Sequence, residues 1–143
     1  MEELLSRLPQ QPPFRFVDRI IEYVPHRYMI SRFDSQPLQK LFGGLSEIPF
    51  TILIEALAQT SVLFIDMEVG RLSEGELPLL GKIECQMLAI SNWTSFLCHV
   101  SPIRVLAKRA MLRGEVFDES GRLIVSVELA VAVTEGDGGV FAN

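Results

Sequence analysis

The sequence contains little of what metal, disulfide or nucleic-acid chemistry requires. Its 143 residues include only two cysteines and two histidines, and none of them has the spacing of a metal-binding motif. We therefore expect no metal and no cofactor, and we expect Cys85 and Cys98 to be free, buried thiols. The net charge of −5 and the pI near 5.0 do not favour nucleic acid as a partner.

The sequence also lacks the pattern of a secretory signal. Residues 1–7 are acidic where a signal peptide is basic, and no apolar segment follows them. The longest apolar run, residues 48–65, is interrupted by Glu55 and Gln59, which does not favour a transmembrane helix. We therefore expect a cytoplasmic protein that has no membrane partner.

One basic cluster interrupts the acidic surface. It consists of Arg104, Lys108, Arg109 and Arg113. These residues are either a solvated strand edge or a landing patch for an acidic carrier protein or a phosphate-bearing arm.

Hydrophobic residues are abundant: they make up 48% of the chain and give it a mean hydropathy of +0.28. This composition and length predict a single well-packed domain, residues 1–134. A Gly-rich end predicts a flexible C-terminal tail, residues 135–143.

The hydrophobic pattern predicts one long helix among strands. We expect a short helix over 2–8, strands over 14–23 and 27–33, a loop over 34–47, a long helix over 49–69 that Gly70 ends, a polar connector over 71–76, and strands over 79–90, 94–100, 107–118 and 122–134. Because the long helix is apolar on nearly every side, something must enclose it, and only the sheet is available. The expected fold is therefore α+β, with an antiparallel β-sheet wrapped around one long central helix and an open edge that invites a second copy.

The central helix carries one carboxylate and one carboxamide a single turn apart. Glu55 and Gln59 are at positions i and i+4, so both side chains emerge from one face. Burying a carboxylate is costly unless it is paired, neutralised or used in chemistry. The pair is therefore either the catalytic site or a buried hydrogen-bonded pair that sets dimer register.

Three segments resemble a known family. Residues 8–23, which contain Leu-Pro-Gln-Gln-Pro-Pro-Phe and Val-Asp-Arg, resemble the opening of the 3-hydroxyacyl-acyl-carrier-protein dehydratases. Residues 49–59, which contain Glu-Ala-Leu-Ala-Gln, resemble the central helix of that family, and residues 111–133 resemble its final hairpin more loosely. The resemblance spans about residues 8–134 and implies the hot-dog fold.

The resemblance also implies an activity and an assembly. It implies a homodimer, or an oligomer of dimers, that binds an acyl thioester of acyl carrier protein or coenzyme A in a tunnel at the dimer interface. In the family, a histidine removes the α-proton and the helix carboxylate of the other subunit protonates the departing hydroxyl. Glu55 and Gln59 match this catalytic pattern.

The catalytic histidine does not carry over. No histidine occurs between His26 and His99, and the two possible alignments place Leu41 or Leu45 at its position. A second family histidine, near the start, is replaced by Gln10. We expect the altered loop and the start of the helix to bind substrate. Backbone N–H groups at the helix start would polarise the thioester carbonyl. The expected substrate-binding residues are Leu41, Phe42, Leu45, Pro49, Phe50 and Thr51.

Three functions remain open. The favoured one is an acyl-thioester-handling protein of the dehydratase-like family whose dehydration is impaired, because His26, His99 and Glu47 are unconvincing substitutes for the missing base. The second is a hot-dog thioesterase in which Glu55 activates water or attacks the thioester. The third is a non-catalytic acyl-binding module, or the inactive subunit of a heteromer.

Overall fold

A single sheet and the helix that it encloses account for most of the structure. The computed structural model describes residues 2–68, 76–106 and 108–135. The elements in chain order are α1 (Glu2–Leu5), β1 (Arg19–Val24), β2 (Tyr28–Asp34), the 3-10 helix η1 (Gln36–Leu38), α2 (Phe50–Glu68), β3 (Glu76–Met87), β4 (Ser95–Val105), β5 (Arg109–Phe117) and β6 (Leu123–Glu135).

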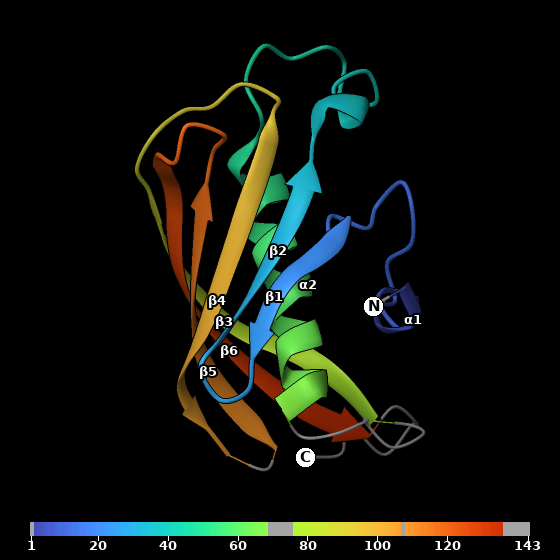
Figure 1. Ribbon diagram of the computed structural model, residues 1–143, viewed down its shortest axis with the longest axis vertical. Helices are drawn as coiled ribbons and strands as arrows, with labels where there is room; N and C mark the ends of the chain where they lie inside the picture. Colours follow the sequence, from blue (N-terminus) through green and yellow to red (C-terminus); the bar gives the residue numbers. More distant parts are fainter. Residues whose placement is uncertain (1, 69–75, 107, 136–143) are drawn as a thin grey trace.

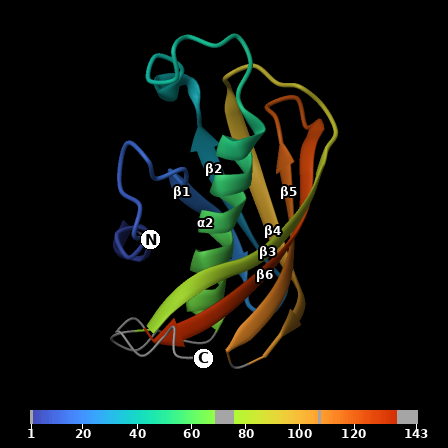
Figure 2. The same cartoon turned by 180° about the vertical axis from the view of Figure 1, so that it is seen from behind.

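The six strands form one antiparallel sheet in the order β1-β2-β4-β5-β6-β3. The sheet curls around α2, and α1 lies beside the helix on the side that the sheet leaves open (Figures 1 and 2). β3 follows α2 in the chain, yet among the described strands it pairs only with β6, so it is an edge strand at the far side of the sheet from β1. This is the α+β hot-dog architecture predicted from the sequence, and that prediction is confirmed.

The core forms between α2 and the concave face of the sheet. Leu53, Leu57 and Phe64 of α2 are completely buried, and β5 alternates buried and exposed residues as a strand with one covered face should. α2 is long and apolar enough to cross a membrane, but 67% of that window is buried inside the protein, as in a core helix. The hydroxyls of Ser31 and Thr60 join the two layers at 2.7 Å.

Helix and sheet approach each other closely at Gly114 on β5. A Cβ atom built there would lie 3.1 Å from Leu57 Cδ2 and 3.0 Å from Val127 Cγ2. Both contacts are tighter than ordinary van der Waals distances, so the absence of a side chain at Gly114 allows α2 to pack closely against the sheet.

Most predicted elements are present, with shifted boundaries. The first strand begins at Arg19 rather than Phe14, because the backbone before it bonds to a helix side chain, as described below. β4 continues past the predicted end to Val105, and a register shift beside Pro102 accommodates the proline. The hairpin turn after Asp118 is present, with Gly121 at a φ of 86°.

The prediction of two buried cysteines is confirmed for one of them and wrong for the other. Cys98 is buried as expected, but Cys85 is exposed, because it lies on edge strand β3 and none of the described elements covers it. Gly70, most of the connector and residues 136–143 of the tail lie outside the described residues, and Glu135 is the last residue of β6.

Candidate active site

Glu55 and Gln59 lie together on α2, as their spacing predicted. Gln59 Nε2 donates a hydrogen bond of 2.9 Å to Glu55 Oε2. Gln59 is 1% exposed, whereas Glu55 is half-buried. Within the described part of the chain, the second carboxylate oxygen of Glu55 has no hydrogen-bond partner. One oxygen is therefore oriented by the amide, and the other remains available to a bound molecule.

Gln59 also fastens the N-terminal segment to the helix. Its Oε1 accepts a bond of 2.7 Å from the Phe16 backbone N–H, and its Nε2 donates to the Phe14 carbonyl at 3.0 Å. These bonds replace those that a strand would make, which explains why Phe14 to Val17 are irregular. The same amide therefore orients the carboxylate and positions the chain that runs past it.

The first turn of the chain is held against the same helix. Arg7 forms an ion pair with Asp66 of α2 at 2.8 Å, and Leu4, Leu5 and Leu8 are buried against the core. The N-terminal segment thus covers one flank of α2, from Asp66 back to Gln59.

The predicted substrate-binding residues lie at the start of α2 and in the loop that precedes it. Pro49 and Phe50 are half-buried, and Thr51 is exposed on the first turn of the helix. In the preceding loop, Leu41 and Leu45 are 61% and 51% exposed. The loop leucines and Thr51 are accessible from outside, and the binding of substrate by these residues stays a prediction.

Trp93 fixes this loop and was not singled out from the sequence. Its Nε1 donates a bond of 2.6 Å to the Leu45 carbonyl, and its ring stacks on Phe42 with centroids 6.0 Å apart. Gln39 Nε2 donates to the same carbonyl at 2.9 Å. The tryptophan is the only one in the chain, but nothing in the sequence indicates its partner, which is 48 residues away.

His26 lies at the opposite end of α2 from the candidate site. Its Nδ1 is 2.9 Å from Oε1 of Glu68, and Glu68 Oε2 accepts bonds from the His26 N–H and the Tyr23 hydroxyl. Glu68 is 13 residues after Glu55, which corresponds to about 20 Å along a helix axis. His26 is therefore too far from Glu55 of the same chain to act as its base.

The contacts among Glu68, Tyr23 and His26 shift the pKa values of Glu68 and Tyr23. Although burial opposes ionisation, the hydrogen bonds from Tyr23 and His26 hold the pKa of Glu68 below its ordinary value. Burial and the adjacent carboxylate raise the pKa of Tyr23. The Glu68 carboxylate is therefore ionised near neutral pH, and it joins the β1–β2 turn to the end of α2.

His99 lies across the sheet from Glu55. His99 lies between the buried residues Cys98 and Val100 on β4, so its side chain is on the face of the sheet away from α2. There its ring packs edge-on against Tyr28, 5.2 Å between centroids. Glu47 is exposed in the loop before α2. Among the described residues, no three His, Cys, Asp or Glu residues are grouped to hold a metal.

The sequence has relatives among curated enzymes. No family model matches the chain. It is 30% identical over 88 residues to the 3-hydroxyacyl-acyl-carrier-protein dehydratase of Proteus mirabilis, covering 59% of each chain. It is 32% identical over 81 residues to the corresponding enzyme of Erwinia tasmaniensis, covering 54% of each. The matches therefore span little more than half the length of these relatives.

Two solved structures of similar fold carry the name thioesterase. A thioesterase family protein from Silicibacter pomeroyi has a TM-score of 0.71 at 12% identity, over 94% of this chain and 96% of that one. A hypothetical thioesterase from Streptococcus pneumoniae, solved with coenzyme A, has a TM-score of 0.63 at 11% identity, over 82% and 85%. At such low identity these matches establish the fold alone.

Proposed function

Because the chain has the hot-dog fold of the thioester dehydratase-like family and is related in sequence to the 3-hydroxyacyl-acyl-carrier-protein dehydratases, we propose that it binds acyl thioesters beside Glu55 and is impaired in dehydration. The observation that carries this proposal is the half-buried Glu55 carboxylate, which Gln59 orients through one oxygen while the other has no partner among the described residues. Acyl carrier protein and coenzyme A are both candidate carriers. The cytoplasm is the proposed location.

The impairment follows from the missing base. Elimination of water requires a base at the α-carbon and an acid at the β-hydroxyl. Leu41 or Leu45 occupies the position of the histidine, and the two histidines of the chain lie at the far end of α2 and on the outer face of the sheet. Loss of a general base lowers a rate by about 10²- to 10⁴-fold.

A thioesterase is the second candidate. Hydrolysis needs one carboxylate to activate a water molecule, or to attack the thioester carbonyl, and Glu55 supplies one without histidine. N–H groups at the start of α2, around Phe50 and Thr51, would polarise the carbonyl. A non-catalytic acyl-binding module, or an inactive subunit of a heteromer, would need the site only for its shape.

We further propose that the chain forms homodimers through β3, with oligomers of such dimers as a further possibility. β3 is a 12-residue edge strand that pairs only with β6 among the described strands, and long open edges are templates for pairing. Next to Glu55, the face of α2 that the sheet leaves uncovered carries the half-buried apolar residues Ile54, Ala58 and Val62. A second copy would cover that stripe and close a tunnel over Glu55. Light scattering in solution tests this: twice 16.1 kDa supports it and a monomer contradicts it.

Product analysis by mass spectrometry tests the reaction. The protein would be incubated with 3-hydroxyacyl and enoyl thioesters beside the Glu55→Gln variant, which keeps the volume of the side chain and removes its charge. We expect binding of both thioesters with dehydration at least about 100-fold below that of a complete dehydratase. Release of free acid that Glu55→Gln abolishes would establish the thioesterase. Absence of binding to either thioester would contradict the proposal.

A gain-of-function experiment tests the reason for the impairment. Leu41 and Leu45 are both largely exposed, so histidine fits either position without disturbing the core. If only the base is missing, Leu41→His or Leu45→His should raise dehydration by at least about tenfold. Combining the active variant with Glu55→Gln should remove the gain. No gain from either substitution would mean that more than the base has been lost.

A further inference from the structure

A hollow on the outer face of the sheet is separate from the Glu55 site. It has a volume of about 320 Å³ and lies where β4, β5, β6 and β3 run side by side. It is lined by Gly81, Arg104, Leu106, Arg109, Ala110, Met111, Ala130, Val131 and Ala132. Its volume is at the lower end of the range for small-molecule pockets, about 300–1,000 Å³.

Small residues create the hollow. Ala130 and Ala132 of β6 lie opposite Met111 and Arg109 of β5, and Gly81 lies at the register shift in β3. None of the three small residues has a side chain long enough to fill the space above the strands. The result is an apolar floor that the neighbouring longer side chains surround.

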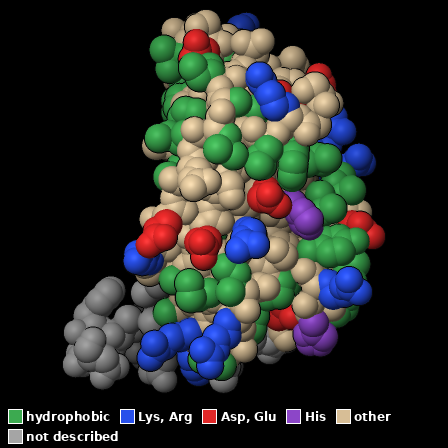
Figure 3. Space-filling view, turned by 90° about the vertical axis from the view of Figure 1, so that its left-hand side faces the viewer, with side chains coloured by type: hydrophobic (Ala, Val, Ile, Leu, Met, Phe, Trp, Pro, Cys, Tyr) green, Lys and Arg blue, Asp and Glu red, His purple; other side chains and the backbone are tan. Residues whose placement is uncertain are grey.

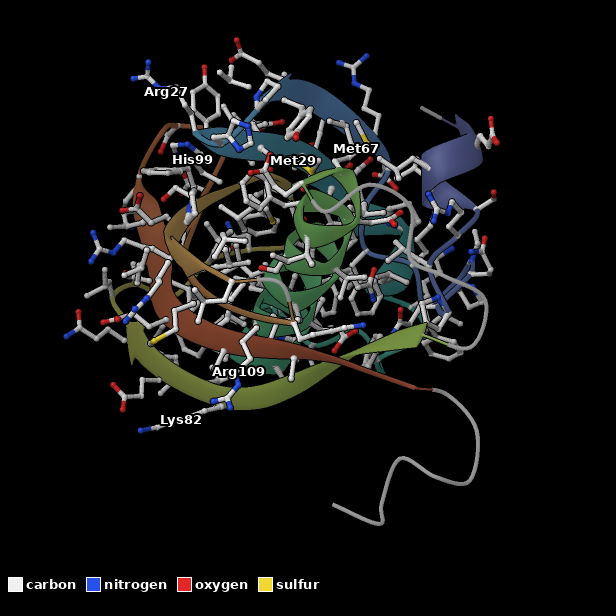
Figure 4. The ribbon with its side chains drawn as sticks, turned by 90° about the horizontal axis from the view of Figure 1, so that it is seen from below. Arg27, Met29, Met67, Lys82, His99 and Arg109 are labelled. Atoms are coloured by element: carbon white, nitrogen blue, oxygen red, sulfur yellow. The ribbon has the colours of Figure 1, made fainter. Side chains whose placement is uncertain are left out.

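Two guanidinium groups stand at the rim of this apolar floor. Neither Arg104 nor Arg109 has a side-chain hydrogen bond or ion pair within the part of the chain that the structure describes. No carboxylate is among the described residues that line the hollow. Figure 4 shows Arg109 and Lys82 extending from the sheet on the side away from α2. Two uncompensated positive charges on a chain of net charge −5 favour an anionic ligand.

The rest of the rim is apolar and exposed. Leu106 is 54% exposed and Met111 is 44% exposed. Figure 3 shows Lys and Arg side chains gathered beside hydrophobic ones at the lower end of this face. A ligand that satisfies both features has one anionic end, which guanidinium forks bind in bidentate fashion, and an apolar body that covers the floor.

We propose that this hollow binds the anion of a medium-chain fatty acid, with its carboxylate between Arg104 and Arg109 and its chain over Ala130, Ala132 and Met111. An acyl carrier protein fits less well, since protein interfaces bury about 800 Å² per partner and the hollow is small, with a volume of about 320 Å³. The inference does not depend on the proposed function, because the site lies across the sheet from Glu55. A protein that handles acyl thioesters would meet such an acid as the product of thioester hydrolysis.

The experiment follows methyl NMR signals of the full chain during titration with decanoate. We expect the shifts to centre on Met111, Ala130 and Ala132. The double variant R104Q/R109Q should bind decanoate at least about tenfold more weakly, because it loses two charge-assisted partners. Arg113→Gln is the matched control, because Arg113 lies on β5 as Arg109 does but outside the hollow. This variant should bind decanoate as the unmodified chain does. Decanol, which lacks the charge, should bind more weakly than decanoate.

Three results would overturn the proposal. The first is decanoate binding that R104Q/R109Q leaves unchanged, and the second is decanol binding as tightly as decanoate. The third is a set of shifts centred on Ala58 and Val62, which would assign the acid to the Glu55 site instead. Glu55→Gln separates the two sites: it should leave binding at the hollow unchanged even if it abolishes all turnover of thioesters.

Discussion

Gln59 allows the sharpest test of how the candidate site is built. Replacing it with leucine keeps the approximate size and the helix propensity of the side chain and removes three hydrogen bonds. Phe16 is 5% exposed, so its N–H would be left buried without a partner, at a cost of about 1–3 kcal/mol. The bonds to Phe14 and Glu55 involve more exposed partners and add about 1 kcal/mol.

The expected loss of unfolding free energy in Gln59→Leu is therefore about 2–4 kcal/mol. Urea denaturation measures it: with an m-value of about 2 kcal/mol/M, the midpoint should fall by about 1–2 M. Hydrogen exchange supplies a local readout, because the Phe16 amide should lose its protection. Gln10→Leu is the control, since Gln10 lies in the same segment and has no side-chain bond within the described residues. A midpoint for Gln59→Leu that matches the control would refute the reasoning.

Three further predictions concern other parts of the fold. Gly114→Ala should lower the unfolding free energy by about 1–3 kcal/mol, because the added Cβ meets Leu57; an unchanged urea midpoint would contradict the packing. The pKa of Glu68 is lower in the folded state than in the unfolded one, so its contribution is present above the unfolded pKa and is lost as pH falls through the folded one. Urea midpoints of the unmodified chain and Glu68→Gln should therefore differ near neutral pH and converge in acid, and a difference independent of pH would count against it. Burial raises the pKa of Cys98 to about 12, so a thiol reagent should modify Cys85 alone in the native protein, and rapid reaction of two thiols would show that Cys98 is accessible.

The fold could be predicted because one feature of the sequence had a single structural solution. The helix over residues 50–68 is apolar around most of its circumference, and a sheet that curls around it was the only element able to enclose it. Strand boundaries were less predictable. The aromatic and β-branched residues from Phe14 onward are typical of a strand, but Gln59 bonds to that backbone from 43 residues away, and no local pattern reports such a partner.

The candidate site was predictable in part for the same reason. The spacing of Glu55 and Gln59 placed both side chains on one face, because helix periodicity is local. The anchoring of Leu45 by Trp93, and the distance of both histidines from Glu55, depend on tertiary contacts that the sequence does not display. The role of Glu55 in a reaction, and the dimer that would enclose it, remain predictions.

The most direct test of the central proposal is a crystal structure with a non-hydrolysable 3-hydroxyacyl thioether analogue. We expect the β-hydroxyl of the analogue within hydrogen-bond distance of the free oxygen of Glu55, with the acyl chain along Ile54, Ala58 and Val62 and a second copy covering it. An analogue bound elsewhere, with Glu55 enclosed only by protein side chains, would contradict the account and leave the Glu55–Gln59 pair a purely structural role.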